Sequence, residues 1–128
     1  MRIYRNQLYP FERAILAELG AALPPGVKES YSAQLRCINK VQRLLDWNEI
    51  EFYCMRFFRV RWPEQYLFLN KDEFILGTGE IGGDSLTADI AVWAVGGHVF
   101  SIESESPLKR FRSLSSVEFR LQQCREAR

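Results

Sequence analysis

Two adjacent glycines between two β-branched, aromatic runs constrain this chain most. Gly96 and Gly97 separate residues 88–95 from residues 98–103. Both central residues of a two-residue hairpin turn need positive φ, which glycine adopts without steric cost. The sequence therefore predicts a β-hairpin whose turn is Gly96-Gly97.

The turn also sets the register of the predicted hairpin. Counting outward from it, the expected pairs are Val95–His98, Ala94–Val99, Trp93–Phe100, Val92–Ser101 and Ala91–Ile102. Because strand side chains alternate between faces, both faces of this hairpin are then apolar. We expect it to be central in its sheet and covered on both sides, at least near the turn.

Two helices are expected before the sheet. Residues 10–23 and 25–45 each place apolar side chains at spacings of three and four, which is typical of an amphipathic helix. Pro24-Pro25 ends the first helix, because the residue before a proline disfavours the α region.

Strands are expected afterwards. Residues 49–62 predict a long strand, perturbed by a bulge and stopped by Pro63, and residues 65–69 and 74–76 predict short ones. Glycine-rich residues 77–84 predict a mobile loop, and residues 104–116 a surface connection. Residues 117–121 favour an edge strand, with a short helix capped by Ser115 as the alternative. The fold class is α+β: two N-terminal helices, then an antiparallel sheet of about five or six strands, in one domain spanning residues 1–128.

Composition excludes several classes of protein. The net charge is +1, which predicts no strong pull toward nucleic acid or a membrane surface. The three cysteines are odd in number and far apart, which argues against a disulfide framework and a Cys-x-x-Cys site. The first residues lack the apolar core of a signal peptide, and no apolar run reaches bilayer length. We expect a cytoplasmic protein.

The sequence has no motif for catalysis, a cofactor or a metal in the context that such a site needs. Residues 77–82 match G-x-G-x-x-G, but a strand follows where a dinucleotide site needs a helix. His98 is the only histidine, so no triad or metal site can be built from repeated histidines. The acidic pairs Glu49/Glu51 and Glu103/Glu105 are expected to be solvated. We predict no catalytic, cofactor-binding or metal-binding residues.

One stretch alternates basic and aromatic residues. Arg56, Arg59 and Arg61 stand among Tyr53, Phe57, Phe58 and Trp62. Such interleaving is typical of platforms for single-stranded nucleic acid, and residues 109–112 are expected to extend it into one patch. The near-zero net charge argues against this interpretation.

The motifs resemble those of one protein family. Leu23-Pro24-Pro25 at a helix start, Gln34-Leu35 within it, Val92-Trp93, and residues 97–103 with Pro107 are similar to a family of small uncharacterised bacterial proteins. Some members resemble immunity proteins of toxin systems. The resemblance implies the fold given above and no catalytic residues. It departs from the family pattern by the second turn glycine and by a single proline after the hairpin.

We therefore expect a non-enzymatic protein–protein interaction module of immunity or regulatory type, with another protein as partner and no feature that specifies an oligomeric state. Interfaces favour aromatic residues and arginine. The predicted contact residues are Trp47, Trp62, Tyr66, Phe111, Arg59, Arg61 and Arg110. Two alternatives stay open. One is a small-molecule binder or enzyme with a pocket between sheet and second helix, lined by Tyr31, Trp93, His98 and Phe100; the other is the single-stranded nucleic-acid binder.

Overall fold

The computed structural model describes residues 8–124 and confirms the α+β class. Helices α1 (Pro10–Ala22) and α2 (Pro25–Cys37) come first, followed by the strands. The strands are β1 (Lys40–Leu44), β2 (Glu49–Tyr53), β3 (Met55–Arg56), β4 (Arg59–Val60), β5 (Phe74–Gly83), β6 (Leu86–Val95), β7 (His98–Glu103) and β8 (Glu118–Cys124). Two short 3-10 helices, η1 (Glu64–Tyr66) and η2 (Leu108–Phe111), lie in the connections.

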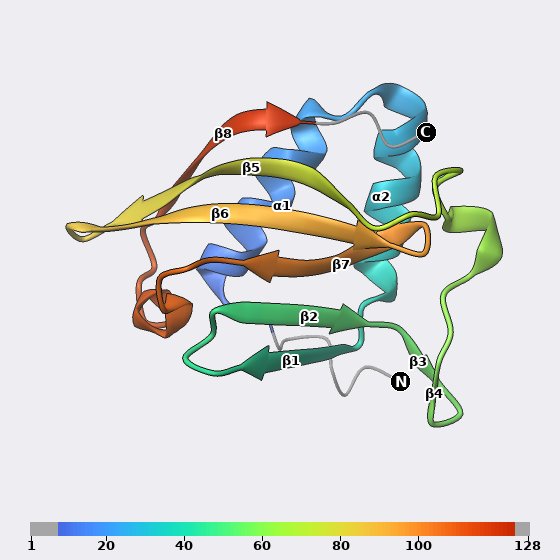
Figure 1. The fold of residues 1–128 in the computed structure, drawn as a ribbon, viewed down its shortest axis with the longest axis horizontal. Coiled ribbons are helices and arrows are strands. Elements are labelled where there is room, and N and C mark those ends of the chain that lie inside the picture. Colours follow the sequence, from blue (N-terminus) through green and yellow to red (C-terminus); the bar gives the residue numbers. More distant parts are fainter. Residues whose placement is uncertain (1–7, 125–128) are drawn as a thin grey trace.

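Six strands form one antiparallel sheet in the order β1-β2-β7-β6-β5-β8, while β3 and β4 form a separate hairpin. The diglycine hairpin, β6–β7, therefore occupies the centre of the sheet, as predicted. Strand β8 lies at one edge, which confirms the strand interpretation of residues 117–121. Both helices lie behind the sheet and cover one of its faces (Figure 1).

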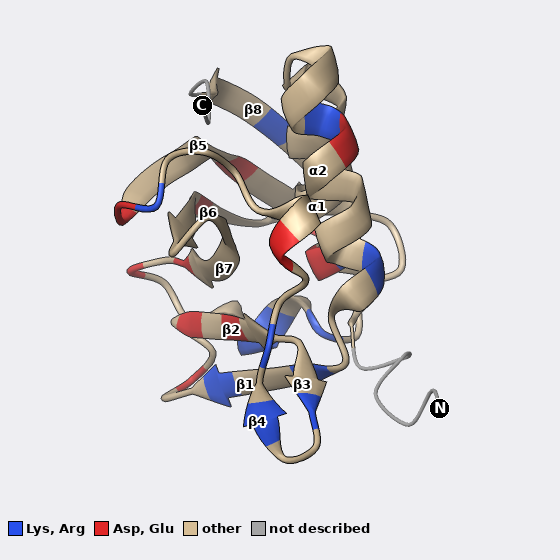
Figure 2. Ribbon diagram, turned by 90° about the vertical axis from the view of Figure 1, so that its right-hand side faces the viewer, with Lys and Arg blue, Asp and Glu red and all other residues tan. Residues whose placement is uncertain are grey.

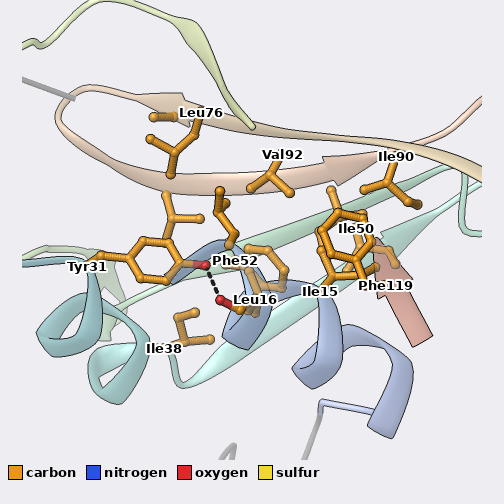
Figure 3. Packing of buried hydrophobic residues seen from close by; sticks show 14 of the residues in the cluster. Ile15, Leu16, Tyr31, Ile38, Ile50, Phe52, Leu76, Ile90, Val92 and Phe119 are labelled. Atoms are coloured by element: carbon orange, nitrogen blue, oxygen red, sulfur yellow. Dashed lines mark hydrogen bonds between the residues drawn. The ribbon is translucent and has the colours of Figure 1, made fainter. Parts of the chain in front are cut away.

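The core fills the space between the helices and the sheet. Ile15, Leu16 and Leu19 on α1 are fully or almost fully buried, and so are Ile50 and Phe52 on β2. Figure 3 shows Ile15 and Leu16 meeting side chains of the strands in one layer. The hydroxyl group of the buried Tyr31 on α2 donates a hydrogen bond to the Leu16 carbonyl at 2.8 Å, which ties the helices together.

The predicted hairpin register holds for two pairs and then shifts. Val95 pairs with His98 and Ala94 with Val99, but Trp93 pairs with Ser101. Phe100 is the extra residue of a β-bulge, so the prediction that it faces Trp93 was wrong. Beyond the bulge the side chains change faces, and Ile102 joins the core side.

The expectation that both faces are covered, at least near the turn, is met only in part. On β6 the residues facing the helices are buried, whereas Ala91, Trp93 and Val95 on the other face are only half-buried. Figure 2, turned to view the sheet from its side, shows the helices on one side only. We call the other side, which neither α1 nor α2 covers, the uncovered face.

Helix α2 ends earlier than predicted. The backbone becomes extended at Ile38, and the Asn39 side chain exchanges two hydrogen bonds with the backbone of Met55. Residues 40–44 then pair with β2 as strand β1. Pairing with a strand that follows in the chain therefore overrides the helical spacing of these residues.

The structure also differs from the prediction of one long strand at residues 49–62 and of a loop at residues 77–84. The chain reverses at Phe57-Phe58 to form the β3–β4 hairpin, and residues 65–69 form part of η1 and an irregular segment instead of a strand. The glycine-rich stretch continues β5 instead of looping. A Cβ at Gly79 would lie 2.4 Å from the Arg120 carbonyl oxygen, so glycine allows β8 to approach closely.

Three hairpin turns contain residues other than glycine in the left-handed region. Positive φ angles occur at Leu45, Trp47, Phe57, Phe58, Asp84 and Ser85. Bulky residues rarely adopt this conformation, which costs free energy at each position.

Candidate functional site

The uncovered face contains a hollow of about 650 Å³ rimmed by acidic side chains. Strand register explains why the acids gather: Glu103 on β7 pairs directly with Glu49 on β2 and with Ala91 on β6. Ala91 pairs in turn with Thr78 on β5, so small side chains form the floor between the acids. We call this feature the acidic hollow; its carboxylates are Glu49, Asp89, Glu103 and Glu105.

Electrostatics in the hollow are unfavourable for the free protein. The pKa of Glu49 is raised by burial, then by its hydrogen bond with Glu51, and by the negative charges of Glu51 and Glu103. Within residues 8–124 the ion pairs are Glu12–Arg43 and Glu80–Arg120, neither of which involves a carboxylate of the hollow. Like charges opposite each other on paired strands destabilise a sheet.

A row of rings continues the uncovered face beyond the hollow. Trp62 stacks on His98 with ring centroids 4.2 Å apart, and Phe100 meets His98 and Tyr53 edge-on at 6.4 and 5.8 Å. The Tyr53 hydroxyl group donates to Glu51 at 2.5 Å, which joins the row to the acids. Burial and this hydrogen bond raise the pKa of Tyr53 to about 12. We call these four side chains the aromatic row.

His98 has a structural role in the row. Burial lowers its pKa, and the hydrogen bond between its Nδ1 and the Val99 carbonyl, at 2.9 Å, opposes that shift only in part. The imidazole is therefore neutral at pH 7. Since a carbonyl oxygen only accepts, Nδ1 carries the proton.

The predicted contact residues are spread over the molecule instead of forming one surface. Phe111 is fully buried, where it packs 5.9 Å from Phe11, so its prediction as an exposed contact was wrong. Trp47 is half-buried, stacked on Phe11 and lying under Arg43. Of the other predicted aromatics, Trp62 is buried and Tyr66 half-buried, while Arg59, Arg61 and Arg110 are exposed.

The predicted pocket between sheet and α2 is not formed by its four residues. Tyr31 is buried in the core on the helix side. His98 and Phe100 belong to the aromatic row, and Trp93 lies on the same uncovered face. The sheet separates Tyr31 from the other three.

The two basic segments expected to form a nucleic-acid patch lie apart. The β3–β4 hairpin is at one end of the long axis of the molecule, and the orange-red turn of residues 108–111 is at the other (Figure 1). The single patch predicted from residues 56–61 and 109–112 was therefore wrong.

The acidic hollow is the feature that the sequence interpretation missed. Glu49 and Glu103 are more than 50 residues apart, and only the register of β2 on β7 places them side by side. The two Glu-x-Glu repeats were the available signal, because residues two apart in a strand share a face.

Further comparisons add no family. Within residues 8–124, no three His, Cys, Asp or Glu side chains are grouped so that they could hold a metal ion. None of the helices in this range is long and apolar enough to cross a membrane. No protein-family model, curated protein or solved structure matches the chain.

Proposed function

We propose that this chain is a non-enzymatic protein–protein interaction module whose uncovered face binds a basic segment of another protein. The observation that carries the proposal is the acidic hollow, whose carboxylates make no ion pair with any residue of the described range 8–124 and surround a floor of small side chains. Lysine or arginine side chains of a partner supply the missing positive charge.

The raised pKa of Glu49 supports a cationic partner. The shift means that the charged form of Glu49 is disfavoured in the free protein. A cation placed between Glu49 and Glu103 favours the charged form of both and so offsets that penalty on binding. Charge complementarity of this kind increases specificity and the association rate more than affinity itself.

The aromatic row supplies the apolar part of the proposed interface. Tyr53 and Phe100 present half-buried rings beside the acids, and ring faces attract arginine and lysine through cation–π contacts. Lys40 already lies 5.8 Å from the Tyr53 ring centroid. Aromatic side chains next to complementary charge are the usual composition of interface hot spots.

A protein of immunity type would use such a surface to cover a basic toxin. The family resemblance on residues 23–25, 34–35, 92–93 and 97–103 with Pro107 supports this narrower form of the proposal. A toxin gene beside the gene for this chain, whose product has a basic surface, is the genomic observation that we expect.

A charge-reversal experiment tests the proposal. Wild-type protein, the Glu49→Lys/Glu103→Lys variant and the control Glu18→Lys/Glu29→Lys are immobilised and exposed to a lysate of the source organism. The control acids are exposed on α1 and α2, away from the uncovered face. We expect a basic protein that wild type and control retain and the Glu49→Lys/Glu103→Lys variant does not.

The retained protein is then purified and its binding measured by calorimetry at low and high salt. We expect the affinity to fall as salt rises, because the contacts are between partly exposed charges. Equal retention by all three baits, or salt-independent binding, would show that the acidic hollow is not the interface.

A further inference from the structure

The β3–β4 hairpin exposes two phenylalanines at its tip. Phe57 is 89% and Phe58 is 100% accessible to solvent, and Val60 beside them is 53% accessible. The hairpin projects from the corner of the molecule, beyond the edge of the sheet (Figure 1). Exposed apolar side chains that gather at one point of the surface, unlike single ones scattered over it, mark an interaction site.

The backbone at the tip makes these residues more unusual. The φ angles of Phe57 and Phe58 are +53° and +67°, the pattern of a two-residue turn that favours Asn-Gly. Phenylalanine at both positions costs conformational free energy that Asn-Gly would not. The rings are therefore present at the expense of stability, which favours a function for them.

Basic residues surround the two rings. Arg56 and Arg59 pair with each other across the hairpin, Arg61 follows, and all three are exposed. Residues 54–62 contain no acidic residue. Figure 2 shows the basic segments of β3 and β4 converging on this projection.

The base of the hairpin is firmly attached to the molecule. The Arg61 amide donates to the Cys54 carbonyl at 2.7 Å, and the Asn39 side chain holds Met55 through two hydrogen bonds. Trp62, the next residue, stacks on His98 in the aromatic row. The tip is thus presented by a fixed support.

We propose that the β3–β4 tip docks on anionic lipid bilayers, with Phe57 and Phe58 inserted among the headgroups and the three arginines on lipid phosphates. Anchoring at a membrane surface combines apolar side chains that enter the headgroup region with cations that contact anionic lipid, and the tip has both. The whole-chain charge of +1 gives no indication of this partner, because the attraction is confined to one hairpin.

The shape of the tip favours a bilayer over other partners. A stable protein interface buries about 800 Å² on each side, far more than two rings and one valine offer. Single-stranded nucleic acid needs a track on which successive bases stack, whereas this tip is a point. A fluid headgroup layer needs neither a large complementary surface nor a track.

Vesicle sedimentation tests the proposal with the full chain. The vesicles are phosphatidylcholine alone and phosphatidylcholine with about 30% phosphatidylserine, at low salt. The Phe57→Asn/Phe58→Gly variant removes the rings and replaces them with the residues that suit the turn, so it folds at least as well as wild type. Leu69→Ser is the matched control, since Leu69 is 84% exposed but lies outside the hairpin.

We expect wild type and Leu69→Ser to bind the anionic vesicles, and Phe57→Asn/Phe58→Gly to bind at least roughly tenfold more weakly, because two apolar rings are lost. Arg56→Gln/Arg59→Gln/Arg61→Gln should lose the preference for phosphatidylserine. A tryptophan at position 58 (Phe58→Trp) should show quenching by brominated lipid.

Three results would overturn the proposal. The first is wild-type protein that ignores both vesicles, and the second is a Phe57→Asn/Phe58→Gly variant that binds as wild type does. The third is a purified protein or single-stranded RNA that binds wild type and not this variant, while vesicles bind neither.

Discussion

Gly97 has neighbours that a side chain would force to shift. Its φ is +92°, and a Cβ there would lie 3.0 Å from Lys71 Cδ and 3.2 Å from the Phe68 carbonyl oxygen. The Gly97 carbonyl accepts hydrogen bonds from the Phe68 amide at 2.7 Å and from Gln34 Nε2 at 3.1 Å. This residue therefore fixes the turn, the segment after η1 and helix α2 at one point.

Substitutions at the two turn glycines should change the free energy of unfolding by different amounts. We expect Gly97→Ala to lower the free energy of unfolding by about 1–3 kcal/mol, through backbone strain and the contacts above. Gly96→Asn should change it by less than about 1 kcal/mol, because asparagine tolerates the left-handed region and the nearest atom to a Cβ there is 3.9 Å away. Urea titration measures both, and equal losses would contradict this assignment.

At the scale of elements, a buried ion pair joins α1 to β1. Glu12 is fully buried and accepts two hydrogen bonds from the Arg43 guanidinium, at 2.7 and 2.8 Å. The same carboxylate accepts from the Tyr9 amide at 2.8 Å, which caps the helix. Removing the arginine leaves a buried charge uncompensated.

We expect Arg43→Met to lower the free energy of unfolding by about 3–5 kcal/mol. The double variant Glu12→Gln/Arg43→Met should recover part of that loss, because the buried charge is gone. Arg36→Met, at an exposed position of α2, is the control. Thermal or urea unfolding of the four proteins gives the comparison, and a double variant no more stable than Arg43→Met would contradict this account of the pair.

Elements were predictable from the sequence where local pattern determines them. The apolar stripe of α1, the diglycine turn and the alternation in β8 were sufficient for those three. The sequence predicts too long a second helix, because Val41 continues the apolar spacing of α2. Pairing with β2 makes residues 40–44 a strand instead. The exposed Phe57 and Phe58 lie at a turn that lacks the usual glycine or asparagine. Without that signal, the sequence of residues 49–62 predicts one strand.

The acidic hollow was beyond prediction for a similar reason. It depends on three cross-strand registers, and a one-residue slip would turn its side chains to the other face. The bulge at Phe100 is such a shift: it moves Ile102 into the core and turns Glu103 to the uncovered face.

Over the whole molecule, a small net charge conceals separated charges. The acids of the hollow lie on the uncovered face, and the arginines of the β3–β4 hairpin lie at a corner (Figure 2). The pKa of Glu49 is raised, so its contribution to stability is present below its unfolded-state pKa and is lost as pH rises through its folded-state pKa. At neutral pH this residue therefore opposes folding.

Glu49→Gln should consequently stabilise the free protein while weakening the proposed interaction. We expect a gain of less than about 1 kcal/mol at pH 7, since the site is largely solvent-screened, and a smaller gain at about pH 4. Affinity for the basic partner should fall. Glu29→Gln on α2 is the control, and a variant that loses stability at pH 7 would contradict the electrostatic account.

The left-handed residues at the turns have a practical consequence. Asp84-Ser85 in the β5–β6 turn, like the phenylalanine pair of the β3–β4 hairpin, adopts positive φ without a glycine. Replacing Ser85 with glycine relieves strain outside the core and leaves both proposed surfaces unchanged. The molecule therefore has a simple engineering route to greater thermal tolerance, with a more robust scaffold for crystallisation or display.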